Sequence, residues 1–245
     1  MDYSDRLLNH GSFVTRLAHR SRLNTLFGLL NDRTYDRALD LGCADGWLLD
    51  QMARAGRVRA GLGVDADPTA LEVARRRFEG RSGFDFVTPD QIAQGGTGDI
   101  DLLICTETLE HVNDAAGEIA KLAAWGKPDA KLVISVPIEV GPSLMVKQVG
   151  RYLANLTTGA YGYELYSWSE LTSAALFWDV DSFESSHRHV SLAGGKGHKG
   201  FDFRRVQREL ERSCRIDKSL FTPFPLLGSA LNSTAFFVCT VNRSS

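Results

Sequence analysis

Short apolar runs alternate with amphipathic segments through the middle of the chain. Runs of a few consecutive apolar residues predict buried strands, and apolar residues that recur every three or four positions predict helices. Strands that alternate with helices indicate a parallel sheet with both faces covered. The expected strands are residues 38–41, 58–64, 84–87, 100–105 and 131–136, and the expected helices are 47–55, 68–78 and 115–125.

The two ends of the chain extend this pattern. Apolar positions at helical spacing predict one or two helices near the N-terminus, in a cap over residues 1–34. Towards the other end, a helix with Asp202 as its N-cap precedes two strand-like runs, 216–221 and 235–241. These two runs are close enough in sequence to pair antiparallel. We expect one domain that spans all 245 residues.

The alternation of strands and helices is interrupted between the expected strand 131–136 and the helix that begins near Asp202. Residues 139–200 are rich in Gly, Tyr, Trp and Phe and show no strand period. A long segment of this kind in a compact domain is more often functional than idle, so we interpret it as an insertion that covers the substrate. Its aromatic residues either stack on a ring or sugar or form a small core of the insertion: Tyr152, Tyr161, Tyr163, Tyr166 and Trp168.

Composition and charge disfavour several classes of protein. The formal net charge of −2 gives no overall basic field that would attract nucleic acid or an anionic membrane. No apolar run approaches the roughly 20 residues of a membrane span. The four cysteines have no C-x-x-C spacing, and the chain starts without a secretory pattern, so we expect a cytoplasmic protein.

The stretch ALDLGCADGW joins the first expected strand to the first expected helix. Gly42, Ala44 and Gly46 leave the backbone bare, so a ligand can approach it closely and meet the N–H groups of the helix. A tight turn without a ligand explains these residues equally well. Asp65 ends the second strand, where a carboxylate can accept both hydroxyls of a ribose. Together the two features indicate an adenosine-type ligand, either NAD or S-adenosylmethionine.

Three stretches taken together narrow this choice. LDLGCADG, then GVDADPTALEVARRR, then DLLICTETLEHV resemble the class I S-adenosylmethionine-dependent methyltransferases over residues 36–140. Within that family they are similar to the branch with E-x-L-E-H-V after the fourth strand, which includes ubiquinone-type O-methyltransferases and sugar and natural-product enzymes. The resemblance implies a Rossmann-like seven-stranded sheet, mostly parallel, with an antiparallel last strand. Ala44 departs from the family, which usually has glycine there.

The resemblance also implies roles for the residues that would bind the cofactor. The methionine part would be lined by the corner after the first strand, and the ribose by the acid after the second. Trp47 either covers the cofactor or anchors its helix in the core. The implied residues are Asp40, Gly42, Ala44 and Gly46 for methionine, Asp65 for ribose, Ala66 beside adenine, Asp90 or its backbone for the adenine amino group, and Thr106 beside the reacting methyl group.

The string after the fourth strand carries groups suited to proton transfer. Glu107, Glu110 and His111 are spaced i, i+3 and i+4, so we expect them on one face of a helical turn. His111 can act as a base towards a hydroxyl, or it can pack structurally. The resemblance places a later histidine near the acceptor, which favours His198. The expected catalytic residues are therefore His111, Glu107 and His198.

Two further ligands remain open. The resemblance includes members with E-x-x-E-H that bind a divalent metal with a later histidine, here Glu107, Glu110 and His111 with His187, His189 or His198. Such a metal would lower the pKa of a substrate hydroxyl. The glycines, lysines and histidine of residues 194–200 can cradle a phosphate or form a hinge loop.

We expect S-adenosylmethionine-dependent methylation of an oxygen on a small molecule such as a sugar or a surface-glycan precursor, with a role in glycan biosynthesis. A quinone or natural-product phenol and an N-methyl acceptor are the alternatives. Nucleic acid is a less favoured partner on charge grounds. From other classes, an NAD-dependent oxidoreductase and a non-catalytic cofactor-binding protein stay open, because a fold does not prove turnover.

Overall fold

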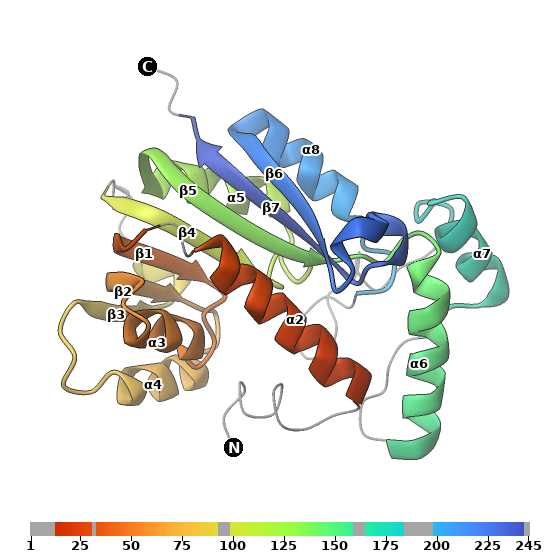
Figure 1. Cartoon of the computed structure of the whole chain (residues 1–245), viewed down its shortest axis with the longest axis horizontal. Coiled ribbons are helices and arrows are strands. Elements are labelled where there is room, and N and C mark those ends of the chain that lie inside the picture. The colour runs from red at the N-terminus through yellow and green to blue at the C-terminus, as the bar shows by residue number, and fades with distance from the viewer. Residues whose placement is uncertain (1–12, 31–32, 93–98, 159–164, 184–197, 243–245) are drawn as a thin grey trace.

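A seven-stranded sheet forms the centre of the molecule, in the order β3-β2-β1-β4-β5-β7-β6 (Figure 1). The computed structural model describes residues 13–30, 33–92, 99–158, 165–183 and 198–242, without the side chains of 13–18 and 154–158. Strands β1 to β5 pair parallel, and β7 pairs antiparallel with β5 and with β6. This is the Rossmann-like arrangement that the resemblance implied, so the expected fold class is confirmed.

The strands and helices have the following bounds. The strands are β1 Tyr35–Leu41, β2 Val58–Val64, β3 Phe84–Val87, β4 Ile100–Thr106, β5 Gly126–Pro137, β6 Cys214–Thr222 and β7 Thr234–Val241. The α-helices are α2 Phe13–Leu29, α3 Trp47–Arg54, α4 Pro68–Arg77, α5 Ala115–Trp125, α6 Ser143–Thr158, α7 Trp168–Leu176 and α8 Phe203–Ser213. Short 3-10 helices are η1 Pro89–Gln91, η3 Pro225–Leu227 and η4 Ser229–Leu231.

Helices cover both faces of the sheet, which is why its strands are apolar at nearly every position. Leu103 and Cys105 of β4 pack into one core, which α5, α7 and α8 help to close. Leu102 and Ile104 point the other way, into a core shared with α2, α3 and α4. Two helices, α6 and α7, lie together beyond one end of the sheet (Figure 1).

Two helices begin where the sequence predicted. The Asp67 carboxylate accepts the Thr69 N–H at 2.9 Å directly before Pro68, the first residue of α4. The Asp202 carboxylate accepts the Arg204 N–H at 2.9 Å and caps α8. A side-chain oxygen at each N-cap satisfies an N–H that the helix itself leaves without a partner.

The segment 139–200 differs from the expectation, because it carries regular structure. Its helix α7 begins with a capping box, in which Ser167 and Glu170 exchange bonds with each other's backbone N–H. This local signal was present in the sequence but was obscured by the aromatic composition. Strand β5 also begins earlier than expected, at Gly126, which pairs with Ile100 before a shift in register.

Several expectations fall outside the described residues. These are the first part of the N-terminal cap, most of the 194–200 segment, and the side chains of Tyr161, Tyr163, His187 and His189. Within the described ranges, none of the helices has the length and apolar character needed to cross a bilayer.

Candidate functional site

The corner after β1 has an unusual backbone at three alternate positions. Gly42, Ala44 and Gly46 have φ angles of 81°, 45° and 70°, which are left-handed. Such angles suit glycine and strain alanine, so Ala44 holds the conformation that the family glycine would adopt freely. Helix α3 begins immediately afterwards, with Gly46 at its N-cap and with the Asp45 carboxylate accepting the Trp47 N–H at 3.3 Å. The next N–H groups of this first turn, those of Leu48 and Leu49, have no acceptor within the helix itself.

A threonine that the sequence analysis missed explains the first of these glycines. A Cβ on Gly42 would lie 2.1 Å from Oγ1 of Thr108, which is closer than any contact allows. The Thr108 hydroxyl lies 3.2 Å from the Leu41 carbonyl and 3.1 Å from that of Thr106, so it can donate to either. It thereby joins the ends of β1 and β4. No local pattern marks this threonine, because its partner lies far away in sequence.

Asp65 reaches back from β2 to the corner. Its Oδ2 accepts the Ala44 N–H at 2.8 Å, and its Oδ1 accepts the Asp67 N–H at 2.9 Å. A carboxylate oxygen has two lone-pair directions, so each oxygen can still accept one hydroxyl. The structure thus brings Asp65 and the corner together, as the ribose role requires.

Asp40 differs from Asp65, because it is buried under the corner. Burial, and secondarily the charge of Asp65, raise the pKa of Asp40 to about 7. Asp45 is a second buried acid in the corner. Its backbone carbonyl and its carboxylate both accept hydrogen bonds from the Arg77 guanidinium, which joins the corner to α4. That pair was not predicted, since Arg77 lies on the next helix.

The remaining residues implied for the cofactor lie around the same edge of the sheet. Thr106 ends β4, Trp47 starts α3 half-buried, and Ala66 is exposed directly after Asp65. Asp90 is exposed on η1. Its pKa is lowered mainly because the nearby Thr88 hydroxyl donates a hydrogen bond to its carboxylate. All four placements are compatible with their expected roles and do not test them.

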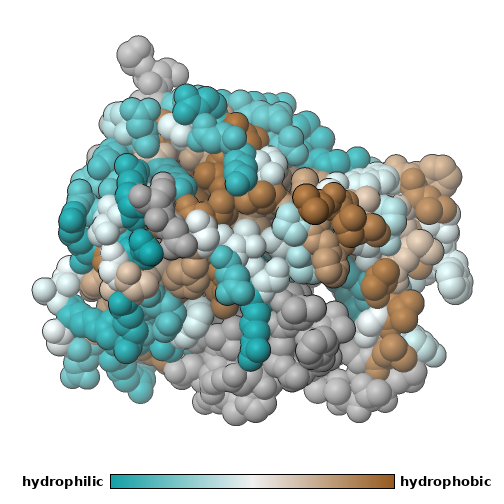
Figure 2. All heavy atoms as spheres, in the orientation of Figure 1, coloured by the Kyte–Doolittle hydropathy of each residue, from teal (hydrophilic) through white to brown (hydrophobic). Residues whose placement is uncertain are grey.

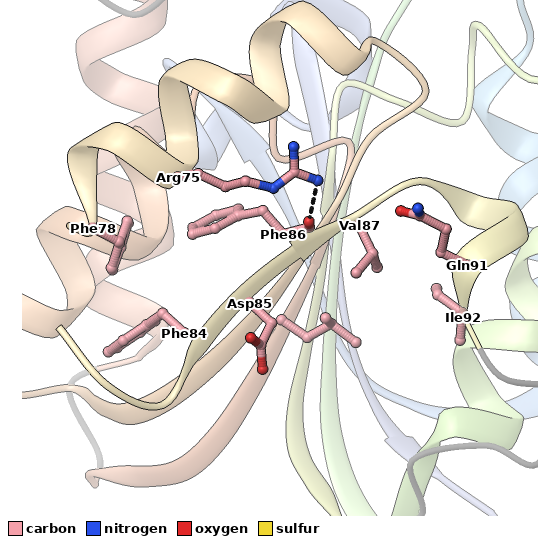
Figure 3. Close-up of a pocket in the computed structure, with 9 residues that line it drawn as sticks. Arg75, Phe78, Phe84, Asp85, Phe86, Val87, Gln91 and Ile92 are labelled. Carbon is pink, nitrogen blue, oxygen red and sulfur yellow. Dashed lines mark hydrogen bonds between the residues drawn. The ribbon is translucent and has the colours of Figure 1, made fainter. Parts of the chain in front are cut away.

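A cavity of about 420 Å³ lies along the edge strand β3 (Figure 3). Phe78, Phe84 and Phe86 line one part of it, and Gln91 of η1 and the following Ile92 line another. Arg75 donates to the Phe86 carbonyl at 2.7 Å beside it. Because the cavity borders neither the corner nor the end of β4, it is not where methyl-transfer chemistry is expected.

The expectation of a helical turn that begins at Glu107, directly after β4, is wrong. Glu107 has a left-handed φ of 52°, and the chain then forms a turn closed by the His111 N–H bonding to the Thr108 carbonyl. Glu107 therefore does not share a helical face with Glu110 and His111. Its carboxylate accepts from Arg22 of α2 at 2.9 Å and from the Ser135 hydroxyl at 3.2 Å.

Three other groups do meet beyond β4. Glu110, His111 and His198 present ligand atoms that all lie within 4.8 Å of one another. The imidazole rings of His111 and His198 meet edge to face, with centroids 4.9 Å apart. Glu110 is fully buried, and burial, then the charge of Glu107, raise its pKa well above the ordinary value. His111 and His198, two of the three expected catalytic residues, thus lie side by side, and Glu107 is not part of this cluster.

A buried acid at the end of β5 completes this part of the site and was not predicted. Glu139 accepts from Lys147 at 3.1 Å and from Arg151 at 2.8 Å, both on α6. Burial alone would raise the pKa of Glu139, but these two cations outweigh it and hold the pKa below its ordinary value. Glu139 in turn acts on His198. Burial lowers the pKa of His198, and Glu139 partly opposes that effect.

The aromatic residues of the insertion divide between its two expected roles. Tyr166 is buried, and its hydroxyl accepts the Gly200 N–H at 2.8 Å, so it belongs to a small core. Tyr152 and Trp168 are exposed. Lys199, which belongs to the segment expected either to cradle a phosphate or to form a hinge loop, pairs with Glu170 at 2.8 Å.

Comparison with known proteins decides the family. Residues 12–196 match the model of a family described as "Methyltransferase domain". The chain belongs to this methyltransferase family. With the fold described above, it is a class I methyltransferase, and S-adenosylmethionine is the cofactor of that class. The corner and Asp65 fit such a cofactor, because together they offer bare backbone and carboxylate oxygens that can accept further hydrogen bonds.

Individual relatives of this methyltransferase are distant. It is 32% identical over 132 residues to the ubiquinone biosynthesis O-methyltransferase of Thiobacillus denitrificans, covering 52% of the chain and 56% of that protein. The enzyme of the same name from Hahella chejuensis is 37% identical over 102 residues, 40% of the chain and 42% of that protein. The chain thus spans only about half the length of these curated relatives.

A solved structure supports the fold of the methyltransferase. The N-methyltransferase NodS from Bradyrhizobium japonicum, in complex with S-adenosyl-L-homocysteine, superposes with a TM-score of 0.56 at 15% identity. The superposition covers 91% of the chain and 87% of NodS. At this identity the likeness concerns the fold alone.

Proposed function

We propose that the protein methylates an oxygen of a small-molecule hydroxyl. The observation that supports this is the pair of imidazoles beyond β4, next to the corner that fits the cofactor. Burial lowers the pKa of His198, and the charge of His111 lowers it further against the opposing charge of Glu139. A neutral imidazole near pH 7 can accept the proton of a hydroxyl, which an oxygen nucleophile must lose.

The residues divide the work as follows. When bound, S-adenosylmethionine supplies an electrophilic methyl group. The protein must align the acceptor oxygen with it and remove the hydroxyl proton. We assign proton removal to a ring nitrogen of His198. Glu139 carries a negative charge that favours the protonated ring, and Lys147 and Arg151 hold that carboxylate in place.

The acceptor belongs to one of two classes in our proposal. A sugar or surface-glycan precursor was the sequence-based expectation, and a quinone or natural-product phenol was its alternative. The names of the curated relatives favour the phenol. We place the acceptor under the segment 139–200. Within this segment, Lys147 and Arg151 of α6 contact Glu139 directly.

A divalent metal is a second candidate for activating the hydroxyl. Glu110, His111 and His198 form a set of one carboxylate and two imidazoles, which suits a divalent transition metal. A tetrahedral ion needs ligand atoms roughly 3.4 Å apart, so the 4.8 Å cluster would have to contract. A bound metal would lower the pKa of the acceptor hydroxyl. Activity that survives exhaustive chelation, with no metal retained by mass spectrometry, would exclude this candidate.

The test is transfer of labelled methyl groups from S-adenosylmethionine to parallel panels of phenols and sugars. His198→Ala should lower kcat by about 10²–10⁴, the typical contribution of a general base. The affinity for S-adenosylhomocysteine should change less than about twofold, since His198 lies outside the corner. Unchanged turnover in both His198→Ala and His111→Ala would contradict the assignment. Preferential binding of NAD would instead support an oxidoreductase.

A further inference from the structure

The exposed large apolar side chains of the described residues are confined to three segments. They belong to residues 145–153 of α6, to residues 165–177 around α7, and to residues 224–231 in the loop between β6 and β7. We call these side chains the apolar surface. Figure 2 shows hydrophobic residues gathered on the side of the molecule where α6, α7 and this loop lie in Figure 1. Elsewhere in the described chain, large apolar side chains are buried or partly buried.

The three segments are joined to one another. Lys147 of α6 donates to the Ser233 carbonyl at 3.2 Å, at the end of the β6–β7 loop. The Gly141 N–H just before α6 bonds to the Ala174 carbonyl of α7 at 2.9 Å. Since both neighbours are bonded to the same stretch around α6, the apolar side chains form one surface.

The β6–β7 loop is built to hold its apolar residues outward. Asn232 is buried beneath it, accepts the Phe224 N–H at 2.6 Å, and donates to the carbonyls of Phe224 and Gly228 at 2.8 and 2.6 Å. These bonds close the loop from inside, while Leu226 at its tip is 98% exposed. A loose loop would collapse to bury such a leucine, so the braced loop fixes it in solvent.

The shape and charge of the apolar surface favour one kind of occupant. Leu226, Trp168 and Val146 project from three different segments and are 98%, 83% and 72% exposed. A rigid partner would need a separate hollow for each of them, whereas a bilayer interface deforms around them. Residues 223–233 carry no charged side chain, and α6 carries no acidic one. Tryptophan and tyrosine among leucines are typical of segments that enter the headgroup region.

We propose that the apolar surface docks the protein on a lipid bilayer, as a peripheral contact and not a span. Leu226, Trp168 and Val146 insert below the headgroups, and α6 lies along the interface. The contact is driven by apolar burial, because the cations Lys147 and Arg151 of α6 are paired with Glu139. This inference does not depend on which acceptor is methylated, since it concerns the opposite side of α6 from Glu139.

The test is co-sedimentation of the full chain with phosphatidylcholine vesicles, with and without phosphatidylglycerol. We expect binding to both compositions, and binding that persists at high salt. The double variant Val146→Glu with Leu226→Glu should weaken it at least about tenfold, because two inserted side chains lose their apolar contact. Both positions are exposed, so the variant should fold as the parent does.

The matched control is Arg208→Glu on α8. It changes the net charge by the same −2 at an exposed position outside the apolar surface, and it should bind vesicles as the parent does. Failure of the parent to bind either vesicle would overturn the proposal. So would equal weakening by the control and the double variant, which would indicate a general charge effect. A concentration-dependent dimer that the double variant abolishes, without vesicle binding, would assign the surface to a second copy of the chain.

Discussion

Position 42 requires glycine for two reasons, the nearby Thr108 side chain and the left-handed backbone of the turn. Any Cβ there meets the Thr108 side chain and must also accept a φ of 81°. At Ala44 the backbone is left-handed too, but the methyl group is already accommodated. The same corner therefore contains one position that cannot gain a side chain and another that keeps a side chain despite a left-handed backbone.

The free energy of unfolding should therefore respond differently to a substitution at each of these two positions. Gly42→Ala should lower the free energy of unfolding by about 2 kcal/mol or more, because strain and overpacking add. Ala44→Gly should change it by less than about 1 kcal/mol, since relief of strain offsets the greater freedom of the unfolded chain. Urea denaturation of both variants beside the parent is the measurement. A destabilisation of equal size in both would contradict the role given to Thr108.

Asp40 makes stability depend on pH in an uncommon direction. Its pKa is about 7 in the folded protein, compared with about 3.9 in an unfolded chain. Between these values the folded state keeps a proton that the unfolded state has released. Stability should therefore be highest below the unfolded pKa, fall by about 1.4 kcal/mol per pH unit between the two values, and level off above pH 7.

The variant Asp40→Asn isolates this effect, because asparagine stays neutral throughout. The difference in free energy of unfolding between the parent and Asp40→Asn should grow in favour of the variant from pH 4 to 7, then stay constant. Asp65, Cys105 and Glu110 are other ionisable groups nearby, but they are present in both proteins. Parallel stability curves over this range would show that Asp40 is ionised in the folded state.

Among the helices and strands, α2 makes a contact with the site that the sequence did not predict. It precedes the whole sheet in the chain, yet Arg22 reaches the Glu107 carboxylate beyond β4. Arg22 also lies 2.9 Å from Nδ1 of His19. Burial, and next the charge of Arg22, lower the pKa of His19 to about 4, while Glu107 opposes them. The N-terminal helix is thus bound to the site through charged groups.

The variant Arg22→Ala should raise the pKa of His19. It removes a cation that disfavours the charged imidazole and leaves Glu107, which favours it. An NMR titration of the His19 ring measures this directly. Arg20→Ala, an exposed arginine on the same helix, is the control and should leave the titration unchanged. An unchanged pKa in Arg22→Ala would mean that Arg22 and His19 do not meet in solution.

Features that depend on neighbouring residues were predictable from the sequence, and contacts between elements distant in sequence were not. Strands such as β4 and caps such as Asp67 and Asp202 were predictable, because burial on two faces and N-cap chemistry leave local patterns. The corner was predictable for the same reason. The Arg22–Glu107 and Lys147–Glu139 contacts join different elements, so no spacing revealed them. The left-handed turn at Glu107 also broke the expected helical spacing, since tertiary bonds from Ser135 and Arg22 hold it.

On the scale of the whole molecule, the cofactor should act as a stabilising ligand. The corner, Asp65 and β4 come from different parts of the sheet, so binding requires the folded protein. S-adenosylhomocysteine at about 100 times its Kd should add about 2.7 kcal/mol. For a chain of this size that corresponds to a rise in Tm of roughly 5–10 °C.

The specificity of this rise identifies the ligand class. NAD at the same concentration should leave Tm unchanged, and Asp65→Ala should remove most of the response to S-adenosylhomocysteine. The variant Asp85→Ala, which removes an exposed acid beside the β3 cavity, is the control and should respond as the parent does. A rise that Asp65→Ala preserves would place the adenosyl group elsewhere.

The reversed strand β7 has a consequence for how this protein can diversify. Because β7 runs against β5, with Thr234 beside Pro137, the β6–β7 loop emerges at the same edge of the sheet as the ends of the parallel strands. A hairpin tolerates changes of length and residue without altering the order of the strands. Selection can therefore vary this loop while the corner that fits the cofactor keeps its residues.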